Sequence, residues 1–315
     1  MRPGSARAEE AEAAVVGAID IGGTKVAAAV VGPDGIRSRQ QMPTRGTDGE
    51  ELFDRVSALL EAAIADAGGA STGVDAVRAI GVGCGGPTRM ADPRRVGPAA
   101  GADWVSPLNI PGWRDFPLRA RLADRFGLPV RVDNDAKAFA LGEGRHGAAR
   151  GVADYVAMVV STGVGGGIVL GGRLVDGADG NAGHIGHVIV TPDGEPCPCG
   201  ARGCLEAEVS GTALARITGR PAAEAPEELR RHTGRLVGRA VASVCNLLDL
   251  RLAVVAGSVA LGFGDPFFSE AQAELDRLAR LDYSRGARVV PSGCGPDGPL
   301  LGAAAVGRLA LARPT

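Results

Sequence analysis

Residues 14–31 read AVVGAIDIGGTKVAAAVV, in which two apolar runs flank the turn sequence DIGGTK of residues 20–25. Runs rich in alanine and β-branched residues around a glycine turn predict a β-hairpin. In the turn, an acid precedes two glycines whose N–H groups can approach an anion, and a hydroxyl and an ammonium group follow, so the loop can cradle a phosphate. An ordinary hairpin with a glycine turn accounts for the same residues, because short motifs often match by chance. The hairpin is therefore predicted, and both explanations of its turn stay open.

A second glycine-rich turn, STGVGGG at residues 161–167, lies between apolar runs at 155–160 and 167–169. It repeats the strand, turn, strand plan of the first hairpin. Two such turns on consecutive domains would place phosphate-binding loops on opposite walls of a cleft. The repetition therefore favours phosphate binding over two unrelated hairpins.

The rest of the chain alternates helical and strand patterns. Apolar residues at helical spacing predict helices at residues 50–68, 113–126, 136–145, 208–216, 234–250, 266–281 and 300–312. Apolar runs predict further strands at residues 77–83, 129–132, 252–256 and 287–290. Residues 85–112 show little periodicity and contain Pro87, Pro93, Pro98, Pro107 and Pro111, so we expect an irregular and functional loop. Strands that alternate with helices predict an α/β fold.

The composition limits the class of protein. The 315 residues are 45% hydrophobic, which is enough for a large core, and the length allows two domains. The net charge of −2 offers no positive field for a nucleic acid partner. No run of 18 apolar residues occurs and residues 1–12 lack the apolar stretch of a signal peptide, so we expect a cytoplasmic protein without a membrane partner. Lysine occurs only at positions 25 and 137, a bias toward arginine that we attribute to genomic composition.

Three nucleotide-binding signatures fail in their context. GVGCGG at residues 81–86 matches the dinucleotide fingerprint, but Pro87 prevents the helix that would hold the pyrophosphate. Neither lysine has the glycine spacing of a Walker A loop. HIGH at residues 184–187 spells the signature of class I aminoacyl-tRNA synthetases, but the lysine-rich loop of that class is missing. We therefore exclude these three classes.

The DND motif at residues 133–135 lies where a predicted strand gives way to a helix. One carboxylate there can project into a cleft while the other caps the helix, and capping alone explains the motif equally well. A general base must lie within hydrogen-bond reach of a substrate hydroxyl. We assign this role to Asp135, with Asn134 beside it as a substrate ligand.

His187 and three closely spaced cysteines, Cys197, Cys199 and Cys204, supply one imidazole and three thiolates. This set matches a closed Cys₃His structural zinc site. The alternative is three packed structural cysteines, which the prolines and glycines around them disfavour because they offer little core. Four protein ligands leave no open position, so we expect the metal to be structural.

In order and spacing, the two glycine turns, the DND motif and the cysteine cluster resemble the ROK family of bacterial sugar kinases and repressors over nearly the whole chain. The resemblance implies a two-domain α/β fold of the actin-like ATPase type, which is hexokinase-like and related to ribonuclease H. We expect a small domain of residues 1–134, joined by a C-terminal helix at 300–315, and a large domain of residues 135–299 with the zinc loop. No helix-turn-helix fits before residue 14, so we expect an enzyme rather than a repressor.

The resemblance also implies phosphorylation of a sugar hydroxyl with ATP and Mg²⁺, a reaction that depends mostly on positioning and electrostatics. It assigns the nucleotide and its phosphates to Asp20, Gly22, Gly23, Thr24, Lys25, Thr162, Gly163 and Gly257. It assigns the sugar to Gly85, Gly86, Asn134, Asp135, Glu206 and the zinc ligand His187. A sugar and ATP are the expected partners, and a homodimer or homotetramer is the expected assembly.

One position departs from the family pattern Glu-x-Gly-His that ends in the zinc histidine. His184 replaces the glutamate that contacts sugar hydroxyls near carbons 2 and 3. Because the phosphate turns and Asp135 are unchanged, the departure concerns the substrate more than the reaction. We expect a 6-kinase for glucose or a related hexose. Kinases for an amino sugar (kanosamine or N-acetylmannosamine) or a cyclitol, a polyphosphate donor, and a weakly active sugar-binding regulator stay open.

Overall fold

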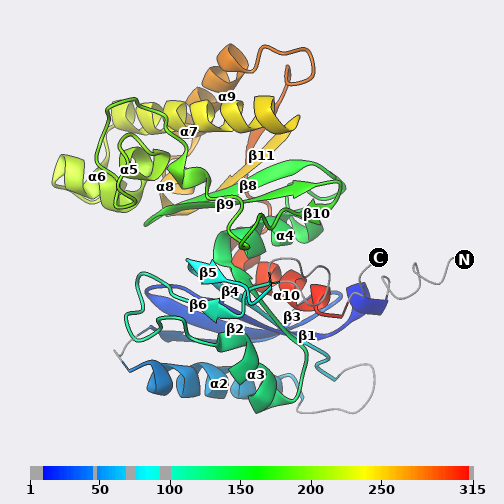
Figure 1. Cartoon of the computed structure of the whole chain (residues 1–315). Helices are drawn as coiled ribbons and strands as arrows, with labels where there is room; N and C mark the ends of the chain where they lie inside the picture. Colours follow the sequence, from blue (N-terminus) through cyan, green and yellow to red (C-terminus); the bar gives the residue numbers. More distant parts are fainter. Residues whose placement is uncertain (1–9, 45–47, 69–75, 93–100, 312–315) are drawn as a thin grey trace, which may run out of the picture. The chain divides into compact units, whose positions relative to one another are not determined.

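The computed structural model describes residues 10–44, 48–68, 76–92 and 101–311, which divide into two compact α/β units (Figure 1). Unit 1 takes its described residues from Met1–Gly142, Asp176–Ala182 and Cys294–Thr315, and unit 2 consists of Glu143–Val175 and Gly183–Gly293. The first division lies inside helix α4 (Asp135–His146) rather than after residue 134. The segment Asp176–Ala182, which we expected in the large domain, belongs to unit 1.

Unit 1 contains a five-stranded sheet with the order β3-β2-β1-β4-β7. Its strands are β1 (Val16–Ile21), β2 (Lys25–Gly32), β3 (Gly35–Pro43), β4 (Ile80–Cys84) and β7 (Val130–Asn134). β1 and β2 form the predicted antiparallel hairpin, and β4 and β7 run parallel to β1. β3, which we did not predict, pairs antiparallel with β2. The parallel strands therefore end at one edge of the sheet, the edge at which α/β sheets bind ligands.

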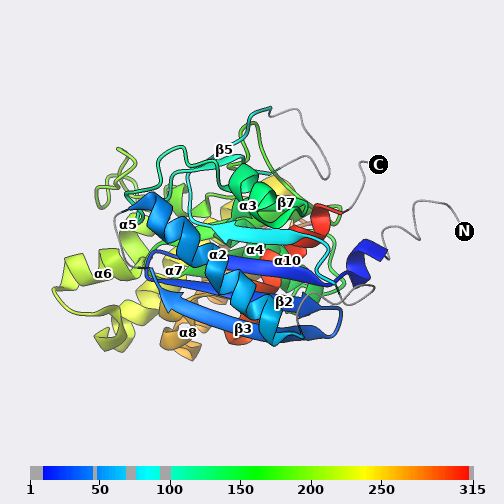
Figure 2. The same ribbon diagram turned by 90° about the horizontal axis from the view of Figure 1, so that it is seen from below.

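The side chains of β1 alternate between two helical layers. Ile19 and Ile21 pack among residues of α2 and α3, on the face of the sheet that Figure 2 shows. Val16 and Ala18 pack on the opposite face with residues of α10. Both faces are buried, as is usual for sheets with parallel strands. The helices are α2 (Gly49–Asp66), α3 (Leu118–Phe126) and α10 (Gly298–Leu309).

Helix α3 begins at Leu118, whereas the sequence pattern predicted a start at Trp113. The Trp113 side chain is buried, and its ring stacks on that of Phe116 with the centroids 4.7 Å apart. Its indole N–H donates to the carbonyl of Gly49 at 2.8 Å. These core contacts hold the chain out of the helix until Pro117, which is its N-cap.

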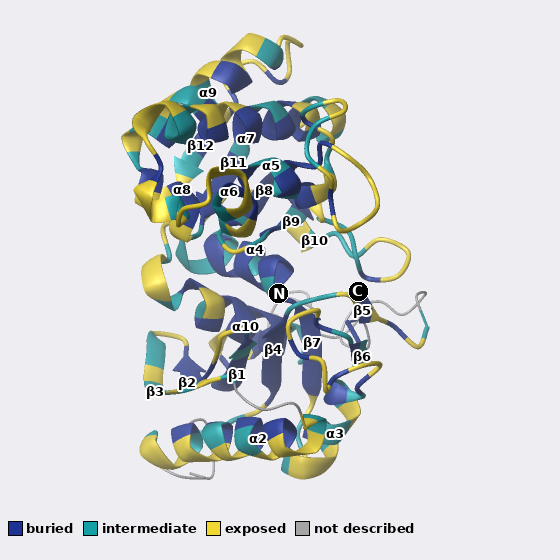
Figure 3. Ribbon diagram, turned by 90° about the vertical axis from the view of Figure 1, so that its left-hand side faces the viewer, coloured by how far each residue is buried: buried dark blue, intermediate teal, exposed yellow. Residues whose placement is uncertain are grey.

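Unit 2 repeats the strand plan of unit 1, with the order β10-β9-β8-β11-β12. Its strands are β8 (Tyr155–Val160), β9 (Val164–Leu170), β10 (Arg173–Leu174), β11 (Leu252–Ala256) and β12 (Arg288–Pro291). β9 begins earlier than predicted, so the turn contains only residues 161–163. Two long helices, α7 (Glu227–Leu248) and α9 (Asp265–Leu278), bury their apolar faces in the core of this unit (Figure 3).

The remaining elements refine several predictions. The predicted helix 208–216 is two helices, because Ser210 ends the first and its hydroxyl caps the second by accepting from Ala213 N at 3.1 Å. The irregular loop contains one short strand pair, and its Pro93 and Pro98 lie outside the described residues, as do the last four residues of the predicted segment 300–315. No helix within the described ranges is both long and apolar enough to cross a membrane. The short elements are β5 (Thr88–Arg89), β6 (Trp104–Val105), η2 (Ile185–His187), α5 (Leu205–Val209), α6 (Gly211–Thr218), η3 (Ala222–Glu224), α8 (Ser258–Phe263) and η4 (Gly295–Asp297).

Candidate active site

The predicted residues of unit 1 meet at the carboxyl edge of its sheet. Ile21, Cys84 and Asn134, the last residues of three parallel strands, are register partners across β1, β4 and β7. The first glycine turn follows Ile21, the pair Gly85 and Gly86 follows Cys84, and Asp135 follows Asn134. The register therefore brings together the unit 1 residues that we assigned to phosphate and to sugar.

Asp20 and Asp135 flank the end of β4. A β-carbon on Gly83 would lie 3.8 Å from Asp20 Oδ1 and 3.5 Å from the Cα of Asp135, so both acids lie close to this glycine. Burial, and to a lesser extent the charge of Asp135, raises the pKa of Asp20 to about 7, although Lys25 and Arg39 oppose the shift. Two neighbouring acids, one of them with a raised pKa, are typical of a site that binds a cation or moves a proton.

The first glycine turn has a fixed backbone and exposed side chains. Gly22 N donates to Lys25 O at 3.0 Å, which closes the turn. Thr44 anchors it from β3's end, because its hydroxyl donates to Gly22 O at 2.8 Å and its N–H to Thr24 O at 3.0 Å. Gly23, Thr24 and Lys25 are exposed. The turn therefore presents a hydroxyl and an ammonium group on a hydrogen-bonded backbone, an arrangement that can bind an anion.

The DND motif divides its tasks among its three residues. Asn134 Oδ1 caps α4 by accepting from Ala136 N at 3.0 Å and from Lys137 N at 3.3 Å. Asp135 Oδ1 accepts from Ala136 N at 2.8 Å, and a β-carbon on Gly85 would lie 4.0 Å from Asp135 Oδ2. Asp133 is buried, and its Oδ1 forms an ion pair with Lys137. Capping and a projecting carboxylate thus occur together.

In unit 2, the second glycine turn lies beside the turn that follows β11. Gly257 has φ +102°, and a β-carbon on it would lie 2.2 Å from Val160 O, so only glycine fits there. The hydroxyls of Ser161 and Ser258 are hydrogen bonded at 2.9 Å. The predicted phosphate ligands Thr162, Gly163 and Gly257 are thereby gathered at one end of the unit 2 sheet.

Glu206 is hydrogen bonded to the residue that follows the second glycine turn. Its Oε2 accepts from the N–H of Val164, the first residue of β9, at 2.8 Å. Glu206 lies in the first turn of α5, whose N-cap is the predicted zinc ligand Cys204. The carboxylate therefore links the second glycine turn to the cysteine loop.

The four predicted zinc ligands converge. The ligand atoms of His187, Cys197, Cys199 and Cys204 all lie within 4.8 Å of one another. His187 Nδ1 is 3.7 Å from Cys197 Sγ, and Cys199 Sγ is 3.7 Å from Cys204 Sγ. In a tetrahedron with Zn–S bonds of about 2.3 Å, neighbouring sulfur atoms are roughly 3.8 Å apart. The donor set and its spacing fit Zn²⁺.

His184 and His187 present parallel imidazoles. Their ring centroids are 6.2 Å apart with an interplanar angle of 13°, and both residues are exposed. They flank Ile185 and Gly186, which are buried in η2. His184 is therefore placed beside the zinc histidine with its side chain accessible.

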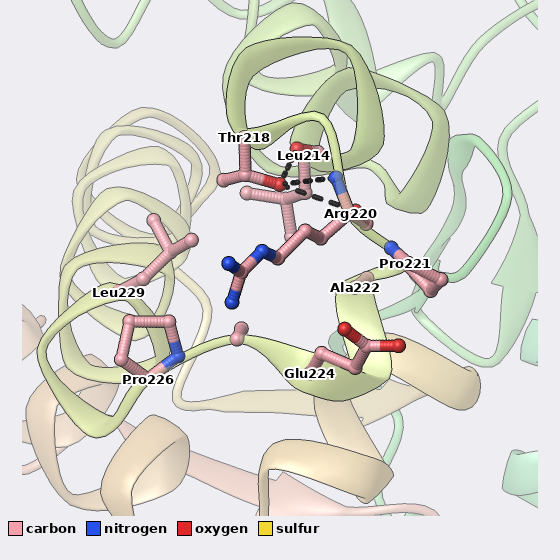
Figure 4. Close-up of a pocket in the computed structure, with 9 residues that line it drawn as sticks. Leu214, Thr218, Arg220, Pro221, Ala222, Glu224, Pro226 and Leu229 are labelled. Carbon is pink, nitrogen blue, oxygen red and sulfur yellow. Dashed lines mark hydrogen bonds between the residues drawn. The ribbon is translucent and has the colours of Figure 1, made fainter.

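A small pocket elsewhere in unit 2 contains none of the predicted site residues (Figure 4). It lies between the end of α6 and the start of α7. Thr218 fixes its rim by donating its hydroxyl to Leu214 O at 2.7 Å and accepting from Arg220 N at 3.2 Å. This pocket is separate from the turns described above.

Sequence reasoning overlooked a charged cluster beneath the DND motif. Lys137 forms ion pairs with Asp133 and Asp176, and Arg131 lies near both acids. The one available signal was that Lys137 is one of two lysines in the chain, which we attributed to genomic composition.

Comparison with known proteins gives a consistent result. The pattern of the ROK family matches residues 16–309. An N-acetylmannosamine kinase of Citrobacter koseri is 37% identical over 267 residues, which cover 78% of this chain and 84% of that protein.

Two solved structures share the fold at more than 30% identity. The ROK hexokinase of Thermus thermophilus has a TM-score of 0.76 and 34% identity, with 93% of this chain and 97% of that chain covered. A ROK family glucokinase of Streptomyces griseus, in complex with glucose and AMPPNP, has a TM-score of 0.74 and 31% identity, with 93% and 99% covered.

Proposed function

This chain belongs to the ROK family, and on that premise we propose that it is an ATP-dependent sugar kinase that transfers the γ-phosphate to the 6-hydroxyl of glucose or a related hexose. One observation carries the proposal. Asp135, a carboxylate that can accept a proton, begins α4 at the sheet edge where β1 ends in the glycine turn. A residue that accepts the hydroxyl proton and a turn that holds the phosphates are two recurring parts of sites that transfer a phosphoryl group to a hydroxyl.

In the proposed step, Asp135 accepts the proton of the attacking hydroxyl. The hydroxyl oxygen forms a bond to the γ-phosphorus, the bond between that phosphorus and the β,γ-bridging oxygen breaks, and a sugar phosphate and ADP result. The hydrogen bond from Ala136 N to Asp135 Oδ1 orients the carboxylate. Asn134 uses its carbonyl oxygen to cap α4, so its amide NH₂ is the group that it can offer to a sugar oxygen.

Asp20 fits the role of a Mg²⁺ ligand. With a pKa of about 7, its carboxyl titrates near neutral pH, and a divalent cation beside it would favour the ionised form. When bound, Mg²⁺ neutralises charge on the phosphoryl group that is transferred. Thr24 and Lys25 follow on the same turn and would contact the phosphates.

In unit 2, we assign nucleotide phosphates to Thr162, Gly163 and Gly257, and sugar hydroxyls to Glu206 and His187. If His187 binds zinc through Nδ1, the nitrogen nearer Cys197, its Nε2 is free to contact the sugar. We propose that the zinc is structural, because its four ligands come from the protein. Homodimer or homotetramer formation remains part of the proposal.

The identity of the sugar is the open part of the proposal. The relatives compared above are named for N-acetylmannosamine, hexose and glucose. His184, an exposed imidazole next to His187, supports an amino sugar or a cyclitol as the alternative to glucose.

The test is an ADP-release assay with Mg²⁺-ATP and a panel of glucose, mannose, N-acetylmannosamine, kanosamine and a cyclitol, with polyphosphate as a second donor. Phosphorylation of at least one sugar that is lost in Asp135→Asn supports the proposal. Sugar binding by calorimetry without ADP release from any sugar would instead identify a regulatory protein.

A further inference from the structure

We propose that Lys137 is a positioning residue for sugar phosphorylation. Its ammonium group connects Asp133, two residues before Asp135, to the segment Asp176–Ala182. The inference rests on the proposed kinase function. It concerns residues of unit 1 alone. It assigns to Lys137 no contact with the sugar or with ATP.

The ammonium group of Lys137 is almost completely buried, with an exposed side-chain fraction of 1%. Its Nζ lies 2.9 Å from Asp133 Oδ1, 2.9 Å from Asp176 Oδ1 and 3.0 Å from Gly180 O. An ammonium group has three protons, and here it has three acceptors. The buried charge is therefore compensated and its hydrogen bonds are satisfied, as stable burial of a cation requires.

Genomic composition does not explain a lysine at this position. Only two of the 34 basic residues are lysines, so arginine is the default cation of the chain. A guanidinium group is planar and directs its donors outward in a fork, whereas an ammonium group directs three donors from one atom. Three acceptors around one point select the ammonium group. We infer that lysine is retained here for this geometry.

On the side of Asp135, Lys137 contacts the two residues that precede it in the chain, Asp133 and Asn134. Asp133 Oδ1, which accepts from Lys137 Nζ, also accepts from Asn134 N at 3.0 Å. The backbone N–H of Lys137 donates to Asn134 Oδ1 at 3.3 Å. Lys137 thus restrains the main chain before Asp135 and the side chain of Asn134.

On its other side, Lys137 holds a segment that also contacts the predicted sugar loop. Asn181 Nδ2 donates to Thr88 O at 3.2 Å, and Asn181 Oδ1 accepts from the Thr88 hydroxyl at 3.3 Å. Thr88 follows Gly86 by two residues and Gly85 by three. Loss of the Lys137 contacts would therefore displace groups on the sugar side of the site.

Asp176→Asn is the sharper test, because it keeps the Asp133–Lys137 pair and weakens the contacts that Lys137 and Arg131 make with Asp176 of the segment. Asp176 is 30% exposed, so the protein should still fold. We expect the KM for the sugar to rise at least fivefold, with the KM for ATP within twofold of wild type. Lys137→Arg should produce the same pattern. Glu61→Gln, which weakens the exposed Arg125–Glu61 pair between α3 and α2 in the same unit, should change neither KM.

A second measurement does not depend on activity. In Asp176→Asn, amide hydrogen exchange in residues 176–182 should be at least tenfold faster, while exchange in β8 stays as in wild type. Wild-type protein that phosphorylates no sugar would overturn the proposed function, and exchange would still report on the segment. Wild-type sugar KM values in active Asp176→Asn and Lys137→Arg, or unchanged exchange in the segment, would overturn the positioning role.

Discussion

Asp20 and Asp135 stand at the same edge of one sheet, separated by β4, and burial together with the charge of Asp135 raises the pKa of Asp20 to about 7. Groups with shifted pKa values collect at functional sites because function requires a charge where the fold alone would not stabilise it. We therefore expect the ionised Asp20 carboxylate to lower the stability of the fold and to be needed for the activity of the site.

Replacement of Asp20 should therefore raise stability and lower activity. The pKa of the folded state exceeds the ordinary value of 3.8, so the folded protein binds the proton more tightly and Asp20 lowers stability as the pH rises from about 4 through 7. Without Mg²⁺ and nucleotide, Asp20→Asn should therefore be more stable than wild type at pH 8, by at most about 4 kcal/mol, and by less than half of that at pH 5. Urea unfolding at both pH values measures the difference.

The matched control for this experiment is Asp34→Asn, an exposed carboxylate between β2 and β3. It should leave the difference between pH 5 and pH 8 unchanged. Asp20→Asn should also lose most of its kinase activity. If Asp20→Asn is no more stable than wild type at pH 8, ionisation of Asp20 does not lower the free energy of unfolding.

Replacement of the base should affect turnover rather than binding. Asp135→Asn keeps a side-chain oxygen that can accept from Ala136 N and leaves the Asn134 cap of α4 in place, so the melting temperature should stay within a few degrees of wild type. It cannot accept the hydroxyl proton, and kcat should fall by roughly 10²–10⁴-fold. Steady-state kinetics on the best sugar, with sugar affinity from calorimetry, checks both expectations. Turnover close to wild type would require a base other than Asp135.

The metal site gives a prediction on content and affinity. Purified protein should contain about one zinc per chain, as expected for one closed Cys₃His site. Cys199→Ser should lose it and weaken sugar binding, because His187 and Glu206 adjoin the cysteine loop. Cys294→Ser is the control, since a serine hydroxyl can still donate to Gly142 O as the thiol does. Less than half an equivalent of zinc in protein never exposed to chelators would contradict the site.

What the sequence predicted correctly is mostly local in the chain. The hairpin around residues 20–25, the strand-to-helix passage at Asn134 and the cysteine cluster each have their signals within a few residues. The start of α3 was misplaced because Trp113 packs against Phe116 in the core, and this packing overrides the helical spacing.

The charged cluster around Lys137 could not be predicted in the same way. Lys137 meets Asp176 across 39 residues, and Asn181 meets Thr88 across 93. No spacing rule links such pairs, because the turns and strands between them determine where the side chains meet. In the sequence, only the scarcity of lysine distinguished position 137. Scarcity alone does not show whether local geometry or genomic composition determines the residue there.

Substrate choice should respond to His184. A neutral imidazole accepts at one nitrogen and donates at the other, whereas a carboxylate accepts at both oxygens and carries a charge, so the two demand different partners on the sugar. A polar group that a bound sugar buries without a partner costs roughly 1–3 kcal/mol, enough to reorder substrates by one or two decades of kcat/KM. His184→Glu, which restores the family residue, should raise kcat/KM for glucose relative to the best native substrate, with the KM for ATP nearly unchanged. His232→Glu, at an exposed histidine of α7, controls for the added charge and should leave the ranking alone. If the sugar ranking is the same in His184→Glu as in wild type, His184 does not contact the sugar, and an unusual substrate loses its support from this position.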